Sequence, residues 1–182
     1  MTAETVKNLL GLVKHPREGG WYVRTWESEE FVAAEAFTDG RYDGPRRTST
    51  AIYYLLEPGT FSEMHVLESD EIFHHYIGDA VEMLELFADG TSRVTVIGKD
   101  IAAGQRVQHT VRRGVWQGSR LLGYGSGLLS SDAASAEASG WALLGCTVSP
   151  GFEFADYRDA SCAELVEGWP REAERIRRLT NR

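Results

Sequence analysis

From residue 19 onward, the chain is a succession of short runs rich in aromatic and β-branched residues, separated by Gly, Asp and Pro. These runs recur roughly every 10–14 residues, and no helical pattern comes between them. They cover residues 21–26, 49–57, 61–67, 71–77, 80–89, 92–99, 105–114, 115–125 and 141–149. Many short strands at regular spacing predict an all-β protein, folded as an antiparallel sandwich or barrel.

Helices are expected only near the two ends of the chain. Residues 3–14 carry apolar side chains at helical spacing, and His15-Pro16 should end that helix. Two further helices are expected at about 161–167 and 170–180. The stretch 27–44 is predicted to be a long surface loop, and the Ser/Ala/Gly-rich stretch 125–140 a flexible connection. We therefore expect one domain over 1–182, with its barrel core at about 19–158.

Composition narrows the classes of function. Hydrophobic residues make up 42% of the chain, and its net charge is −8, so nucleic acid is not an expected partner. No apolar run approaches the roughly 20 residues of a membrane span, and the N-terminus lacks the pattern of a secretory leader. We expect a cytoplasmic protein that does not bind membranes. Cys146 and Cys162 predict no disulfide framework, and Cys146 is expected to be buried.

The segment PGTFSEMHVLESDEIFHHYIGD (58–79) concentrates the residues that can carry chemistry. Strand alternation puts His65 and Leu67 on one face of the first strand, and Glu71, Phe73 and His75 on one face of the next. Asp70 and His74 then point the other way. We expect a turn at 68–70 to pair the two strands and to bring His65 near Glu71. Such a pair can bind a metal, share a proton or hold a substrate hydroxyl, or it can be an ordinary surface pair.

Further candidates lie elsewhere in the predicted strands. Gln117 would need a hydrogen-bond partner on the inner face of a barrel, and we expect it to contact the ligand. Trp116, Tyr53, Phe73 and His75 are candidates for substrate binding, although aromatic residues are also common in cores. His109 has no acidic neighbour in the sequence, so we interpret it as a surface or core histidine.

The segment 58–79 resembles the first motif of the cupin superfamily, with Gly59, His65, Glu71 and Gly78 at the family positions and Leu67 in place of the second histidine. VRRGVWQGSRLL (111–122) resembles the second motif, with Gly114 kept, Gln117 in place of the last metal-binding histidine, and Arg112 in place of a proline. The resemblance implies an antiparallel cupin barrel, that is, a jelly roll or double-stranded β-helix. Of the metal ligands that the cupin motifs usually supply, only His65 and Glu71 remain here, and Gln117 is the one further candidate ligand. A divalent metal is therefore possible, and no cofactor is certain.

Several blocks in order, HPREGGWY, STAIYYLL, SDEIFHHYIGD, GVWQ and CTVSPGFEFADY, resemble an uncharacterised single-domain cupin family over about residues 15–158. That family is similar in fold to the epimerases of deoxysugar pathways. The resemblance implies a small-molecule ligand inside the barrel.

Three functions follow as hypotheses. The first is an epimerase-like or isomerase-like enzyme in which His65 and Glu71 transfer protons on a sugar-like or small keto substrate. It agrees with the lack of a dinucleotide-binding, P-loop or GxSxG motif. The second is a non-catalytic module that binds a metabolite, and the third is a metal-dependent, dioxygenase-like enzyme. We also expect a homodimer, because the strand at 21–26 would otherwise leave a sheet edge exposed.

Overall fold

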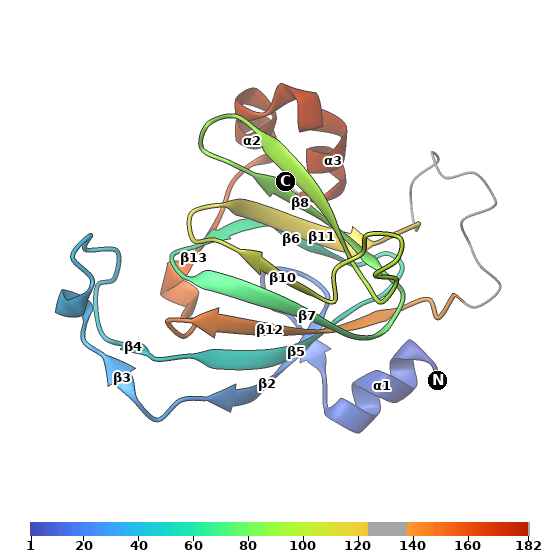
Figure 1. Cartoon of the computed structure of the whole chain (residues 1–182), viewed down its shortest axis with the longest axis horizontal. Coiled ribbons are helices and arrows are strands. Elements are labelled where there is room, and N and C mark those ends of the chain that lie inside the picture. Colours follow the sequence, from blue (N-terminus) through green and yellow to red (C-terminus); the bar gives the residue numbers. More distant parts are fainter. Residues whose placement is uncertain (124–137, 182) are drawn as a thin grey trace.

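The computed structural model describes residues 1–123 and 138–181, in which two antiparallel sheets pack face to face (Figure 1). One sheet has the order β1 (Val13–Lys14), β2 (Trp21–Glu27), β5 (Thr50–Leu56), β12 (Ala142–Ser149), β7 (Asp70–Gly78) and β10 (Gln108–Val111). The other has the order β13 (Tyr157–Asp159), β6 (Phe61–Leu67), β11 (Trp116–Leu121), β8 (Val81–Leu86) and β9 (Ser92–Ile97). The expected all-β antiparallel fold is confirmed. Most of the connection predicted at 125–140 lies outside the described residues.

The chain changes sheet between β5 and β6, and again between β6 and β7. The hairpin expected between 61–67 and 71–77 is therefore wrong. The β6 strand pairs with β11 and β13, whereas β7 pairs with β12 and β10. Residues 68–69 carry the chain across the gap between the sheets. His65 and Glu71 consequently face each other from opposite sheets rather than from adjacent strands.

The interior between the sheets has an apolar end and a polar end. At the apolar end the inward residues form one buried cluster: Tyr54, Leu56, Phe73, Val81, Met83, Ile97, Val111, Leu121, Ala142, Leu144 and Cys146. Strand alternation continues this inward face along β12 to Val148 and along β7 back to Glu71. The polar end begins there.

Helices cover the outer faces of both sheets (Figure 1). Helix α1 (Ala3–Leu10) packs Val6 against Leu55 and Leu143 of the first sheet. Helices α2 (Cys162–Gly168) and α3 (Ala173–Arg178), joined by the 3-10 turn η3 (Pro170–Glu172), pack Leu165, Ile176 and Leu179 onto Met64, Leu84 and Leu86 of the second sheet. The central strands are therefore buried on both faces.

Two expectations about local structure need correction. The N-terminal helix ends at Leu10, short of the expected residue 14, because Gly11 adopts a left-handed conformation at φ 67° that terminates it. The loop predicted at 27–44 contains the 3-10 turn η1 (Ala34–Ala36) and β3 (Phe31–Val32), which pairs with β4 (Arg46–Arg47). Two elements near the C-terminus were not expected: the 3-10 turn η2 (Phe154–Asp156) and β13.

Candidate functional site in the barrel interior

A cavity of about 480 Å³ occupies the polar end of the interior. That volume suits a small metabolite. Its polar lining consists of His15, Glu18, Arg24, Thr50, His65, Glu71 and Glu153. Its remaining wall comes from Val13, Tyr22, Val23, Ile52, Leu67, Cys146, Val148, Phe152 and Phe154. Both sheets and the segments 15–18 and 152–154 therefore contribute to one site.

His65 lies on β6 and is only 1% exposed. Its Nδ1 is 2.7 Å from the carbonyl oxygen of Glu63. Because a carbonyl oxygen can only accept a hydrogen bond, Nδ1 carries the ring proton of the neutral imidazole. The Nε2 atom is then left with a lone pair. The ring also stacks on Tyr157, with ring centres 5.0 Å apart, which fixes its plane.

Gln117 on β11 joins His65 to Glu71. Its Nε2 lies 3.3 Å from His65 Nε2 and donates to Glu71 Oε2 at 2.7 Å. Both partners are acceptors, so the amide nitrogen must be the atom between them. The amide oxygen is buried, with no hydrogen-bond partner among the described residues. A buried polar atom without a partner is rare and is a reason to examine the site for a ligand.

Glu71 is buried at the cavity. Burial, together with the nearby Glu18 carboxylate, raises its pKa from 4.5 to about 7, against the opposing effects of His65, the Gln117 amide and the Cys146 thiol. The Cys146 thiol lies at the cavity and forms a hydrogen bond with Glu71. Burial raises the pKa of this thiol well above its usual value. Glu71 is therefore able to gain or lose a proton near neutral pH.

The cavity wall opposite these residues comes from the tight loop that joins β1 to β2. His15 N donates to Gly20 O at 3.1 Å, and Gly19 and Gly20 have φ of 91° and 67°. A Cβ at Gly19 would lie 2.4 Å from the Phe61 carbonyl oxygen, so only glycine fits there. This loop directs His15 and Glu18 into the cavity. Sequence reasoning missed both residues, although HPREGGWY contains them and could have indicated them.

The second missed segment follows β12. The Phe152 N–H donates to Thr50 Oγ1 at 3.0 Å, and the buried Arg46 guanidinium holds Asp156 through hydrogen bonds of 2.8 and 2.7 Å. These contacts fix the segment that presents Phe152, Glu153 and Phe154 to the cavity.

None of the five candidate binding residues is among the residues that line the cavity, although Gln117 contacts His65 and Glu71, which do line it. Trp116 points outward from β11 and packs beside α2 and α3. Tyr53 packs under α1 and meets Tyr76 edge to face. Phe73 is a core residue, and His75 Nε2 lies 3.0 Å from Asp79 O. Strand alternation puts Phe73 and His75 on the same face as Glu71 but does not fix how far along the barrel they lie. Trp116 and Tyr53 are candidates as aromatic residues, with no face assigned from the sequence, and they pack on the outer faces of the sheets.

His109 is a buried histidine, one of the two outcomes expected for it, but it has an acidic partner that the neighbouring sequence did not indicate. His109 Nε2 lies 2.9 Å from Glu85 Oε2, and both side chains are buried. Arg93 contacts the same carboxylate at 2.7 and 2.8 Å. Burial alone would raise the pKa of Glu85, but its hydrogen bonds with His109 and Arg93 lower it. Glu85, His109 and Arg93 therefore satisfy one another's polar groups, and none of them lines the cavity.

The side chains at the cavity do not form a good metal site. Within the described residues no group of three or more His, Cys, Asp or Glu side chains is placed to hold a metal ion. Leu67 offers no donor atom, and Gln117 turns its amide nitrogen, not its oxygen, toward His65 and Glu71. Two good protein ligands fall short of the three that catalytic zinc sites usually supply.

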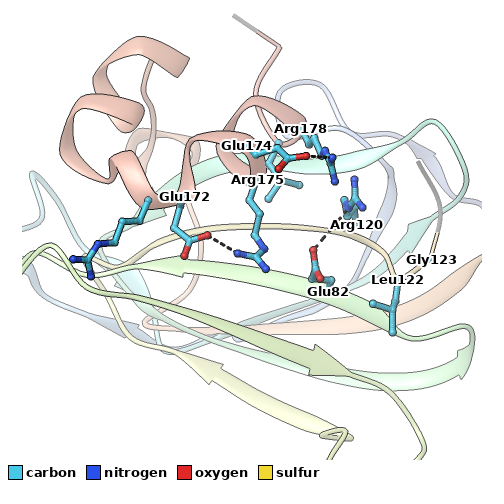
Figure 2. A pocket seen from close by; sticks show the side chains of 10 residues that line it. Glu82, Arg120, Leu122, Gly123, Glu172, Glu174, Arg175 and Arg178 are labelled. Carbon is cyan, nitrogen blue, oxygen red and sulfur yellow. Dashed lines mark hydrogen bonds and ion pairs between the residues drawn. The ribbon is translucent and has the colours of Figure 1, made fainter. Parts of the chain in front are cut away.

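A second hollow, of about 310 Å³, lies between β8, β11 and α3 (Figure 2). Six of its seven charged side chains form the pairs Glu82–Arg120, Glu172–Arg175 and Glu174–Arg178, and the seventh is Arg171. It contains no histidine or cysteine among its lining residues. We therefore place the candidate site in the interior cavity.

Two face-to-face antiparallel sheets, between which the chain crosses repeatedly, packed around a cavity lined by polar and apolar side chains, define the cupin class of barrel. The family model described as "Cupin superfamily (DUF985)" matches residues 4–160. The chain belongs to this family. No helix in the described part of the chain is long and apolar enough to span a membrane.

Solved structures agree with this assignment. The chain is similar over its whole length to a hypothetical protein from Leishmania major, with 30% identity, full coverage of both chains and a TM-score of 0.83. It is similar to a protein from Shewanella oneidensis at 29% identity and TM-score 0.80, covering 100% of this chain and 98% of that one. Oxalate decarboxylase from Bacillus subtilis shares the fold alone, at 10% identity and TM-score 0.50, over 94% of this chain and 37% of that chain. A search of the curated proteins gave no match.

Proposed function

We propose that the protein is an enzyme that transfers protons on a small, uncharged carbonyl or sugar-like substrate, as an isomerase or epimerase does. The observation that carries this proposal is the His65 imidazole. Its Nδ1–H is held by the Glu63 carbonyl, which leaves Nε2 as the basic atom of the ring at the cavity. Proton abstraction beside a carbonyl requires a fixed tautomer with a basic nitrogen, and the donor that His65 Nε2 meets among the described residues is the Gln117 amide nitrogen, at the long distance of 3.3 Å.

Glu71 supports this role without touching His65. When His65 takes a proton it becomes a cation, and the Glu71 carboxylate, linked through Gln117, stabilises that charge in a site of low dielectric. With a pKa of about 7, part of the Glu71 population is ionised at neutral pH. The reaction needs no redox cofactor.

The charges around the cavity favour an uncharged substrate. Three lining residues are acidic, namely Glu18, Glu71 and Glu153. The one cationic side chain among the described lining residues that stays charged at all ordinary pH values is Arg24, which pairs with Glu27 at 3.0 Å. A phosphate or carboxylate group would therefore meet repulsion without a free arginine or lysine to bind it.

The test is deuterium exchange from D2O into dihydroxyacetone, glyceraldehyde and xylose, followed by proton NMR. We expect loss of signal at the carbon next to the carbonyl, faster than in a buffer blank and faster than with His65→Asn. Exchange no faster than with His65→Asn for every compound would contradict an enzyme of this class. Binding of the same compounds measured by calorimetry would then favour the non-catalytic module.

We also propose that the protein is a homodimer joined through β2. The short β1 strand pairs only with Trp21 and Tyr22, and no other described strand covers that edge of β2 beyond Tyr22. Trp26, on the open part, is 53% exposed. An open strand edge with an exposed aromatic residue favours pairing with a second copy. Light scattering at micromolar concentration should give twice the chain mass, and a monomer would contradict the proposal.

A further inference from the structure

Two histidines line the cavity, and backbone groups hold their imidazoles in opposite tautomers. His65 donates from Nδ1 to the Glu63 carbonyl, so its Nε2 is the acceptor. His15 has the reverse arrangement, because its Nδ1 accepts the backbone N–H of Glu18 at 2.8 Å. An amide N–H can only donate, so the proton of the neutral His15 ring must be on Nε2. One ring therefore offers a lone pair and the other an N–H.

The His15 N–H is available to a ligand. The nearest carboxylate atom, Glu18 Oε2, is 3.9 Å from Nε2, which is too long for a hydrogen bond. The other Glu18 oxygen is occupied by Ser62 Oγ, which donates to it at 2.6 Å. The ring of His15 is otherwise surrounded by the aromatic rings of Tyr22, Tyr54 and Phe154. Its side chain is only 4% exposed, so a donor placed there is shielded from solvent water.

The positions of the two rings are coupled through a single residue of β6. The carbonyl of Glu63 holds His65 Nδ1 at 2.7 Å, and the amide of Glu63 donates to the Glu18 carbonyl, also at 2.7 Å. Tyr54 Oη adds a third anchor by donating to Gly19 O at 2.9 Å. The loop that carries His15 is thus tied to the strand that carries His65. Such preorganisation is needed when donors must be aimed at charge that appears only during the reaction.

We propose that His15 Nε2–H binds the carbonyl oxygen of the substrate, while His65 Nε2 takes the proton from the adjacent carbon. This inference rests on the proposed function and assigns the orientation of the substrate in the cavity. The substrate is then a compound with a C–H bond next to a ketone or aldehyde, held between the loop at 15–18 and β6.

The step is balanced without a further reactant. The C–H bond breaks, its proton forms an N–H bond at His65 Nε2, and its electron pair moves through the carbon–carbon bond onto the carbonyl oxygen. The resulting enolate oxygen accepts the hydrogen bond from His15, which keeps its proton. Return of the proton from His65 to the neighbouring carbon, with the hydroxyl proton shifted between the two oxygens, gives an isomer. Return to the original carbon in D2O gives exchange.

Two substitutions at residue 15 separate this role from a structural one. In His15→Asn the side-chain oxygen can still accept the Glu18 N–H, but nothing replaces Nε2–H. In His15→Gln the amide nitrogen reaches the place of Nε2 and can still donate. We expect exchange into dihydroxyacetone to fall by about 10²–10³-fold in His15→Asn, as for loss of one oxyanion donor. We expect the exchange rate of His15→Gln to be at least ten-fold higher than that of His15→Asn. The outward-facing variant His74→Asn should match the wild type.

A second measurement does not depend on turnover. Long-range ¹⁵N–¹H correlation spectra of the unliganded protein should show His15 protonated at Nε2 and His65 at Nδ1. A proton on His15 Nδ1 would overturn the inference, even if His15→Asn fails to fold. Wild-type exchange with an equally fast His15→Asn variant would also overturn it and leave the proposed function standing. No exchange by the wild type would instead refute the proposed function, and this inference with it.

Discussion

The interior contains two buried histidine–glutamate groups that occupy one row of side chains across the second sheet. Cross-strand register runs from His65 to Gln117, from Gln117 to Glu85, and from Glu85 to Arg93. At one end Glu85 forms an ion pair with Arg93 and a hydrogen bond with His109, and its pKa is lowered. At the other end Glu71 reaches into the row from the opposite sheet through Gln117, forms no ion pair with an arginine of the described residues, and has a raised pKa.

The difference shows how similar residues take different roles. The Glu85 group has its charge and hydrogen bonds satisfied inside the protein, so it has no capacity left for a ligand. The His65 group keeps a basic nitrogen that meets only the Gln117 amide at 3.3 Å, a buried amide oxygen without a partner among the described residues, and a carboxyl that titrates near neutral pH. Uncompensated polar groups beside a cavity are costly unless a ligand uses them. This contrast is open to direct tests.

The largest expected effect is on catalysis. His65→Asn removes the basic nitrogen, and we expect exchange into dihydroxyacetone to fall about 10²–10⁴-fold, the usual contribution of a general base. His109→Asn removes an imidazole that is also buried but lies outside the cavity. The exchange rate of this variant should stay within about three-fold of the wild type, because energetic coupling between separate sites is small. Initial rates measured by NMR at one pH give the comparison. Equal losses of exchange rate in His65→Asn and His109→Asn would contradict the assignment of a catalytic role to His65 alone.

The next effect is on stability. Glu85→Gln removes the charge shared by Arg93 and His109, and breaking a buried ion pair typically costs about 3–5 kcal/mol in the free energy of unfolding. The Arg93 side chain is 44% exposed and can turn to solvent, which favours the lower end of that range. Glu71→Gln, the matched variant, should not be destabilised at pH 8. Urea denaturation of both variants checks this. A greater loss of unfolding free energy in Glu71→Gln than in Glu85→Gln would mean that Glu71, not Glu85, belongs to the structural group.

The pH dependence of stability sharpens the same comparison. Because the folded-state pKa of Glu71, about 7, lies above its ordinary value of 4.5, the fold prefers the protonated carboxyl. That contribution is complete below pH 4.5 and is lost as the pH rises to about 7. Relative to Glu71→Gln, the unfolding free energy of the wild type should therefore fall by on the order of 3 kcal/mol across this window. Urea titrations at closely spaced pH values measure it; parallel profiles would show that Glu71 titrates normally.

The smallest expected effect concerns substrate charge. Glu18 and Glu153 line the cavity, whereas Arg24 is already paired with Glu27. We expect dihydroxyacetone phosphate to bind several-fold more weakly than dihydroxyacetone, because partly exposed like charges cost about 1 kcal/mol. Calorimetry at low salt gives both affinities. Tighter binding of the phosphate would mean that a cation outside the described lining serves the site.

The structure brings together some of the side chains that the sequence singled out, for reasons that particular residues make clear. Alternation correctly put His65 and Leu67 on the face that lines the cavity, and His74 on the other face of β7, beside Thr147 and Tyr76. Gln117 meets His65 and Glu71, as its inward position indicated. Alternation could not say how deep each inward residue lies, so Phe73 was grouped with the pocket although it belongs to the core.

The sequence alone determined the antiparallel all-β class, the helices at both ends and the facing of residues within each strand, because each depends on local periodicity and turn chemistry. Only the tertiary structure decided which strands are neighbours. It brought the loop with His15 against β6 and paired Glu85 with His109, residues 24 positions apart. It also placed His65 and Glu71 in different sheets. The physical reason is that a jelly roll closes by packing two sheets over a shared interior, and contacts across that interior leave no periodic signal in the chain.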